Sequence, residues 1–236
     1  MARRRIYPSP ASTPLIEQQE PLHTPLDRER IINTALELLR TEELANISMR
    51  RIADALGVKA AALYYHVKDK DQLLHGLAEQ ISKQIPFPDA SLAWRDQLAL
   101  WASSFRHTLN QYRDAVTIMG ATIAGSPTRL AHIEYLYRVL FEADFPDARI
   151  PWLAAMVKNF IMGFADEERR LLDRASDNGE TMEEMSEDYA DRFQSLPQDQ
   201  YPHVIRLASI TTAPDLDAEF AFGLGVLLDG FEASRQ

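Results

Sequence analysis

The sequence predicts an all-α protein in two parts, an N-terminal three-helix domain with a helix-turn-helix and a C-terminal helical bundle. Apolar residues recur every three or four positions through most of the chain, which is the period of a helix. The alternation of apolar and polar residues that is typical of strands appears nowhere over a useful length. The proline-containing run at residues 86–91 interrupts the helical pattern, so we expect domains at residues 26–85 and 91–236.

The composition limits the class of protein. The 236 residues are 46% hydrophobic, which is enough for a substantial core, and they include no cysteine. Disulfides and thiolate metal sites are therefore excluded. No apolar run approaches the ~20 residues of a membrane helix, and the basic N-terminus lacks the apolar segment of a secretory signal. We expect a soluble cytoplasmic protein with no membrane partner, no metal and no cofactor.

Charge is distributed unevenly along this chain, whose net charge is −10. Residues 1–75 contain 11 Lys and Arg against 10 Asp and Glu, whereas residues 76–236 contain 14 against 25. The negative net charge of the whole chain argues against non-specific binding of polyanions, but the nearly neutral N-terminal third leaves room for a basic face. The acidic stretch at residues 166–192 is expected to be partly a mobile loop.

Residues 1–25 are expected to form a flexible arm, because they contain five prolines and few large apolar residues. Arg3, Arg4 and Arg5 make this arm basic. Arginines on such arms can enter narrow A·T-rich minor grooves of DNA. The alternative is a disordered tail with incidental charge, and both interpretations stay open.

Four short helices are expected between the arm and the break at residue 86. The first begins after Asp27, and Ser48 caps a second helix that Gly57 ends, because glycine takes the left-handed backbone that terminates helices. A third helix would cover residues 59–65, and Asp69 would cap a fourth. The side chains expected inside the helix-turn-helix are those of Ile52, Leu56, Val58 and Leu63.

The spacing of the second and third helices is that of a helix-turn-helix, whose second helix lies in the major groove of DNA. Small residues begin this helix and would let it sit deep in the groove. Polar residues follow it and can donate hydrogen bonds to phosphates; they are Tyr64, His66, Lys68 and Lys70. An ordinary antiparallel helix pair is the alternative, but it does not explain why these donors cluster after the turn.

The run ISMRRIADALGVKAAALYYHVKDKDQLL and the preceding helix RERIINTALELLR resemble the TetR family of bacterial repressors. The resemblance implies that Arg50 reaches a guanine edge and that Tyr64 touches the DNA backbone or a thymine methyl. It further implies phosphate contacts by Ser48, His66 and Lys70, although His66 has a second interpretation as a solvated residue. Tyr65 is expected to pack inward, because it alternates with Tyr64 around the helix.

Alanines occupy the start of the third helix, where the family often has hydrogen-bonding side chains. Base recognition would then depend on Arg50, Lys59, Tyr64 and methyl contacts from Ala60 and Ala62. Such contacts predict a preference for thymine.

The C-terminal runs WRDQLALWASSFRHTLNQYRDA and FAFGLGVLLDGFEA resemble the tetracycline-repressor subgroup of this family. The resemblance implies an all-helical domain that binds a small molecule and dimerises through two long helices near residues 150–172 and 215–233. Two apolar helices late in an acidic chain indicate such an interface independently. Gly163, Gly223 and Gly225 would permit close helix approach, or serve only as packing relief.

The resemblance does not extend to the drug. Trp101 and Met119 stand where that subgroup has residues that hold tetracycline and its magnesium ion, and Pro86 stands near an expected histidine; Phe105 does match. Magnesium prefers oxygen ligands, so we predict no tetracycline–magnesium response. The residues expected to line a pocket for a large, flat, lipophilic molecule are Trp101, Phe105, Met119, Tyr135, Met156 and Phe160, with His107 and Glu167 as polar anchors. An aromatic stripe at helical spacing is also typical of plain core.

The function expected from these features is that of a dimeric repressor that binds a palindromic double-stranded DNA operator and is released by an aromatic small molecule. An activator, a constitutive regulator and a protein bound by a peptide are alternatives, and operator position relative to a promoter decides between repressor and activator. A hydrolase using Ser104 and His107 is the remote alternative, because the sequence contains no G-x-S-x-G motif.

Overall fold

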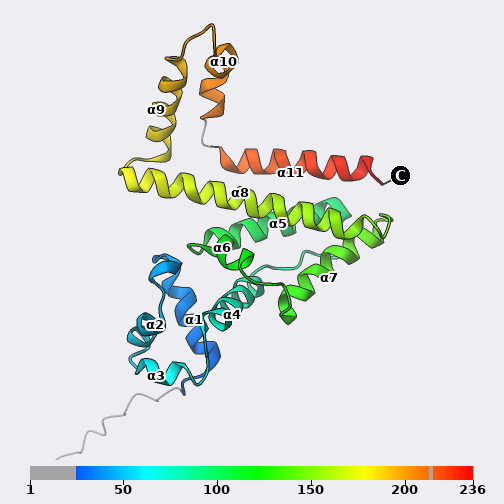
Figure 1. The fold of residues 1–236 in the computed structure, drawn as a ribbon. Helices are drawn as coiled ribbons and strands as arrows, with labels where there is room; N and C mark the ends of the chain where they lie inside the picture. Colours follow the sequence, from blue (N-terminus) through cyan, green and yellow to red (C-terminus); the bar gives the residue numbers. More distant parts are fainter. Residues whose placement is uncertain (1–24, 213–214, 236) are drawn as a thin grey trace, which may run out of the picture.

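A computed structural model describes residues 25–212 and 215–235, and within them the chain forms eleven α-helices, one short 3-10 turn and no strand (Figure 1). The all-α prediction is therefore confirmed. The arginines of the predicted arm, Arg3, Arg4 and Arg5, lie outside the described residues. None of the described helices is long and apolar enough to cross a membrane.

The N-terminal domain consists of α1 (Arg28–Leu38), α2 (Met49–Leu56), α3 (Ala60–Leu63) and α4 (Lys70–Lys83). The predicted caps are present, since the side chains of Asp27, Ser48 and Asp69 each accept a hydrogen bond from a backbone N–H in the first turn of their helix. The helices α1 and α4 pack closely, because Gly76 leaves room for the side chain of Ile32, which a Cβ would meet at 2.5 Å. These contacts make α1 to α4 one packed unit.

The turn between α2 and α3 forms as predicted, but α3 is shorter than expected. Gly57 has φ of 68°, the left-handed conformation that ends α2. The helix α3 stops at Leu63 rather than at residue 65, and a turn follows in which the N–H of Val67 donates to the carbonyl of Leu63. The prediction that Tyr65 packs inward is wrong, because the helical period does not continue through this turn and Tyr65 is 87% exposed.

The C-terminal domain is built on α5, α7 and α8, with α11 running alongside α8 in the opposite direction (Figure 1). The helices α9 and α10 pack on each other and project beyond the end of α8 (Figure 1). The bounds are α5 (Trp94–Asn110), α6 (Ala115–Gly120), α7 (Pro127–Glu142), α8 (Ile150–Asn178), α9 (Met182–Gln194), α10 (Pro202–Thr211) and α11 (Leu216–Ala233).

The acidic stretch at residues 166–192 is helical over most of its length, and the loop expected in part of it is limited to residues 179–181. The helix α8 continues to Asn178 and ends at Gly179, which again takes the left-handed conformation. Its acidic side chains pair with basic ones one turn away, as Asp166 does with Arg170 at 2.6 Å. Such i,i+4 pairs offset the repulsion between like charges on a helix.

A buried arginine joins three helices of this domain. Arg106 on α5 forms a two-bonded ion pair with Glu168 on α8, at 2.7 and 2.8 Å, and its third bond goes to Asp217 on α11. Its guanidinium also lies over the rings of Phe164 and Phe220. The bonds to Glu168 raise the pKa of Arg106, so this link between α5, α8 and α11 stays charged.

Candidate DNA-binding surface and ligand cavity

The side chains expected to contact DNA come from α2, the turn before α3, the turn after α3, and α4. Arg50, Lys59, Tyr64 and Lys70 are exposed, and His66 is half-buried. The hydroxyl of Ser48 accepts the N–H of Arg51, because Ser48 is the cap of α2. These positions remain predicted DNA contacts.

Two adjacent arginines in the first turn of α2, Arg50 and Arg51, have different surroundings. Arg51 is held against the protein by Glu42, to which its Nε donates at 3.1 Å, and this bond lowers the pKa of the Glu42 carboxyl. Arg50 instead projects into solvent. Arg50 is thus the exposed one of the two arginines, and its contact with a base stays a prediction.

The alanines of α3 differ in their surroundings. Ala60 packs against the hydrophobic core and Ala62 is half-buried, whereas Ala61 is exposed. Of the three methyl groups, that of Ala61 is the most open to a DNA groove. Sequence reasoning named Ala60 and Ala62 instead, because the exact start of α3 sets which face each alanine occupies.

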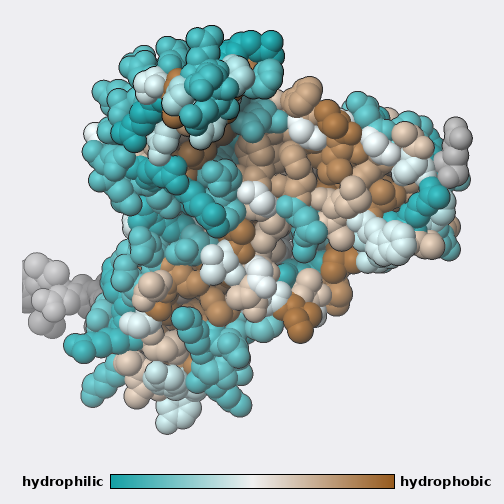
Figure 2. All heavy atoms as spheres, turned by 45° about the horizontal axis from the view of Figure 1, so that its top comes forward, coloured by the Kyte–Doolittle hydropathy of each residue, from teal (hydrophilic) through white to brown (hydrophobic). Residues whose placement is uncertain are grey.

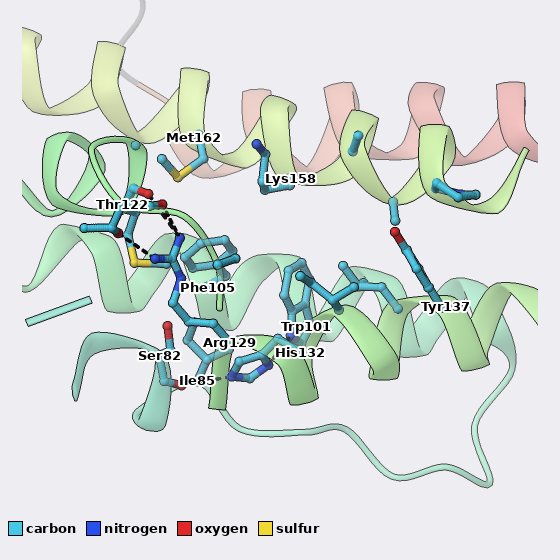
Figure 3. A pocket seen from close by; sticks show the side chains of 18 residues that line it. Ser82, Ile85, Trp101, Phe105, Thr122, Arg129, His132, Tyr137, Lys158 and Met162 are labelled. Atoms are coloured by element: carbon cyan, nitrogen blue, oxygen red, sulfur yellow. Dashed lines mark hydrogen bonds between the residues drawn. The ribbon is translucent and has the colours of Figure 1, made fainter. Parts of the chain in front are cut away.

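A cavity of about 370 Å³ lies in the C-terminal domain between α5, α7, α8 and the loop after α6, close to the end of α4 (Figure 3). Three of the predicted side chains line it, namely Trp101, Phe105 and Met119. The other lining residues are Ser82, Ile85, Gly120, Thr122, Ala124, Arg129, His132, Ile133, Leu136, Tyr137, Pro151, Ala154, Ala155, Lys158 and Met162. The cavity is mostly apolar with a few polar groups, as small-molecule sites commonly are.

The other five predicted ligand residues do not line this cavity, and their contact with a ligand stays a prediction. Tyr135 is buried beside Phe87, and Phe160 packs on Phe220 of α11. The remaining three are not among the lining residues: His107 and Met156 are exposed, and Glu167 borders a separate hollow beside α9. Helical spacing put them on apolar stripes but could not tell which stripe faces the cavity.

His132 connects the wall of the cavity to the DNA-binding domain. The indole N–H of Trp101 donates to Nδ1 of His132 at 3.2 Å, so Nε2 carries the proton and donates to the carbonyl of Ser82 on α4 at 2.9 Å. Burial lowers the pKa of His132, which favours this neutral form. Sequence reasoning missed His132, because a single histidine on an apolar helix carries no motif.

Arg129 is a buried charged residue of the cavity wall. It is 9% exposed, and its guanidinium donates to Thr122 Oγ1 and to the carbonyls of Met119, Thr122 and Ile123. Burial lowers the pKa of Arg129. Figure 3 shows the guanidinium turned toward Thr122, at the end of the cavity away from Tyr137.

Further hydrogen bonds hold the C-terminal domain to the N-terminal one. Glu79 on α4 accepts a hydrogen bond from the hydroxyl of Thr128 at the start of α7. At the corner between α5 and α6, the N–H of Arg113 donates to the carbonyl of Leu39 at 2.7 Å, and Asp114 accepts the N–H of Leu44 at 2.8 Å. The helices around the cavity are thus bonded directly to the helix-turn-helix domain.

The fold and the cavity together define a class, that of helix-turn-helix regulators with a helical sensor domain. Residues 31–77 match the family described as bacterial regulatory proteins, tetR family, and residues 87–235 match the tetracyclin repressor-like C-terminal domain. The chain therefore belongs to the TetR family, a family of DNA-binding transcriptional regulators and not of enzymes. The prediction that the protein is not an enzyme is thereby confirmed, against the remote alternative of a hydrolase that uses Ser104 and His107.

Individual relatives support this assignment. The chain is 31% identical to a class G tetracycline repressor of Vibrio anguillarum over 90% of this chain and 96% of that protein. The structure superimposes on ActR of Streptomyces coelicolor in complex with actinorhodin with a TM-score of 0.78, at 26% identity, covering 90% of this chain and 99% of that one. It also matches BioQ in complex with its double-stranded DNA operator, with a TM-score of 0.61 at 25% identity, over 89% and 99% of the two chains.

Proposed function

We propose that this protein is a repressor that binds a palindromic operator as a homodimer and is released from it by a lipophilic, aromatic small molecule. The observation that carries the proposal is the bond from His132 to Ser82, because it joins the wall of an aromatic cavity to α4. A molecule that displaces α7 or Trp101 would displace α4 and, with it, the packed unit α1 to α4. The ligand and operator named for ActR and BioQ support a cavity and a DNA site in corresponding domains.

The outer face of α8 and α11 is the proposed dimer interface. Its exposed apolar side chains include Trp152 and Met156 on α8 and Phe222 and Val226 on α11. Figure 2 shows apolar surface gathered over this part of the molecule, beside the hydrophilic region of α9 and α10. Exposed apolar patches of this kind are typical of association sites.

The glycines of these helices have different roles. A Cβ at Gly223 would lie 3.0 Å from the ring of Phe160, so Gly223 serves packing within the protomer. Gly163 and Gly225 have open space around them and are available to a second copy.

Induction then follows from geometry. Two recognition helices must stand ~34–36 Å apart to enter successive major grooves on one side of DNA. A ligand that binds better to a dimer with another spacing shifts the population toward a form that does not fit the operator.

The proposal is tested by selecting bound sequences from a random DNA pool and titrating the complex with aromatic compounds in a mobility-shift assay. We expect an inverted repeat among the selected sequences and release of the DNA by at least one lipophilic aromatic compound. Binding without any release indicates the constitutive alternative, and selected sites without two-fold symmetry contradict the dimer. Transcription in vitro from a promoter that carries the selected site then distinguishes a repressor from an activator.

A further inference from the structure

We propose that the effector is an aromatic carboxylic acid, bound as its carboxylate between Arg129 and Lys158 with its rings against Trp101 and Phe105. This inference rests on the proposed function, because it assigns a chemical class to the molecule that occupies the same cavity. It goes beyond lipophilicity, which the apolar walls alone would indicate.

The charge of the cavity wall is opposite to that of the protein. Two of the 18 lining residues, Arg129 and Lys158, are cations, and no lining residue is acidic. The whole chain, in contrast, has a net charge of −10. The cavity therefore favours an anion in a protein that otherwise repels anions.

Arg129 provides the fixed cation. It is almost fully buried, yet its hydrogen bonds go only to neutral oxygens, and within the described residues it forms no ion pair. The nearest acidic influence is Glu79, whose carboxylate is bonded to Thr128. Glu79 acts on Arg129 through its charge and not through a hydrogen bond. A buried cation is costly unless it is paired and hydrogen-bonded, so a carboxylate in the cavity would supply a directly bonded partner.

Lys158 provides the adjustable cation. It lies on α8, on the side of the cavity opposite α7 (Figure 3), and it is an exposed residue. In the part of the chain that the structure describes, the side chain of Lys158 forms no ion pair and no hydrogen bond. A lysine on a flexible stem can follow a carboxylate whose position varies between ligands.

The remaining polar groups do not compete for this role. Both ring nitrogens of His132 are engaged, by Trp101 and by Ser82, so His132 offers the ligand neither a charge nor a free donor. Most of the other lining side chains are apolar, including Ile133, Leu136 and Met162, and the further polar ones, Ser82, Thr122 and Tyr137, are uncharged. An occupant with one anionic group and a flat apolar body therefore fits this lining better than a neutral hydrocarbon or a polyanion.

The experiment uses the full-length protein and matched pairs of probes with two to four fused rings, such as anthraquinone-2-carboxylate and its methyl ester. Affinity is measured by calorimetry and by quenching of tryptophan fluorescence, to which Trp101 contributes. We expect the acid of at least one pair to bind about 10-fold more tightly than its ester, as a charge-assisted bond allows. Lys158→Gln should reduce acid binding about 3- to 10-fold and leave ester binding unchanged.

The controls separate charge from folding. Arg170→Gln removes an exposed cation on the same helix, away from the cavity, and should change neither probe. Arg129→Gln should abolish the preference for the acid, whereas Arg129→Lys should retain part of it, with thermal unfolding used to check both variants. Because Arg129 also ties the loop after α6, the exposed Lys158 variant keeps the test valid if Arg129→Gln fails to fold.

Equal binding of acid and ester in every pair overturns the proposal, as does equal weakening of both probes by Lys158→Gln, or no binding by any pair. The mobility-shift assay keeps this failure distinct from failure of the proposed function. If neutral esters release the DNA as well as the acids do, the regulator remains and only the anionic class of effector is wrong.

Discussion

Replacing His132 with phenylalanine tests whether this side chain links the cavity to α4. Phenylalanine keeps the ring that stacks on Phe87 at a centroid distance of 4.5 Å. It removes the acceptor for the indole N–H of Trp101 and the donor to the carbonyl of Ser82. That carbonyl retains the N–H of Ile85 at 3.1 Å, so the chief penalty is one buried indole N–H without a partner.

An unpaired buried donor costs about 1–3 kcal/mol, so His132→Phe should lower the free energy of unfolding by that amount. Urea unfolding at one protomer concentration measures it, because the stability of a dimer depends on concentration. The double variant His132→Phe with Trp101→Phe removes both polar partners. We therefore expect His132→Phe to destabilise the Trp101→Phe variant much less than it destabilises the unmodified protein. Additive losses in this cycle would show that the hydrogen bond contributes nothing.

The same residue predicts a pH dependence with a definite sign. Burial lowers the pKa of His132 below its ordinary value of 6.5, so the unfolded chain takes up this proton before the folded protein does. The His132 contribution to stability is therefore fully present above about pH 6.5 and decreases as the pH falls toward the folded value. His132→Phe should reduce the loss of stability between pH 7 and pH 5, and an unchanged slope would refute the neutral form of His132.

Further variants test the other parts of the molecule. Arg50→Ala should weaken operator binding in a mobility-shift assay by an amount equivalent to about 1–3 kcal/mol, whereas Arg51→Ala should act mainly on stability; equal effects of the two on DNA affinity would contradict their separation. Glu168→Gln should destabilise the protein by about 2–4 kcal/mol in urea unfolding because it breaks a buried ion pair, whereas Asp188→Asn, in an exposed pair, should cost less than about 1 kcal/mol. Phe222→Glu should convert the dimer to a monomer in sedimentation experiments, and an unaltered dimer would exclude the face of α8 and α11 as the interface.

The features that depend on local sequence could be predicted. Ser48, Asp69 and Gly57 define helix ends by chemistry that acts within a few residues, and all three do so in the structure. The helix-turn-helix follows from that spacing. The length of α3 could not be predicted in the same way, because Tyr64 and Tyr65 would fit a helix and it is the burial of Leu63 and Val67 that fixes the turn.

The cavity depends on contacts between residues far apart in the chain, and there the prediction was partial. Trp101 and Phe105 could be found because two large aromatics stand one turn apart on one helix. Arg129 and His132 could not, since their roles come from Thr122 on the loop before α7 and from Ser82, 50 residues away on another helix. The role of a polar residue on an apolar helix can be assigned only when the residues that it contacts are known.

Control of the DNA-binding domain from the cavity requires that α4 move as part of that domain. The contact between Gly76 and Ile32 holds α4 against α1, so a displacement at Ser82 turns the whole unit rather than bending one helix. The hydrogen bond that the N–H of Leu44 donates to the carboxylate of Asp114 holds the same unit at its other end. A ligand that shifts α7 would pull on α4 through the bond between His132 and Ser82. If the bond between Leu44 and Asp114 stays in place, this pull would rotate the recognition helix about the corner between α5 and α6. The corner is therefore the expected pivot, and Asp114→Ala should weaken the response to ligand more than it weakens binding of DNA.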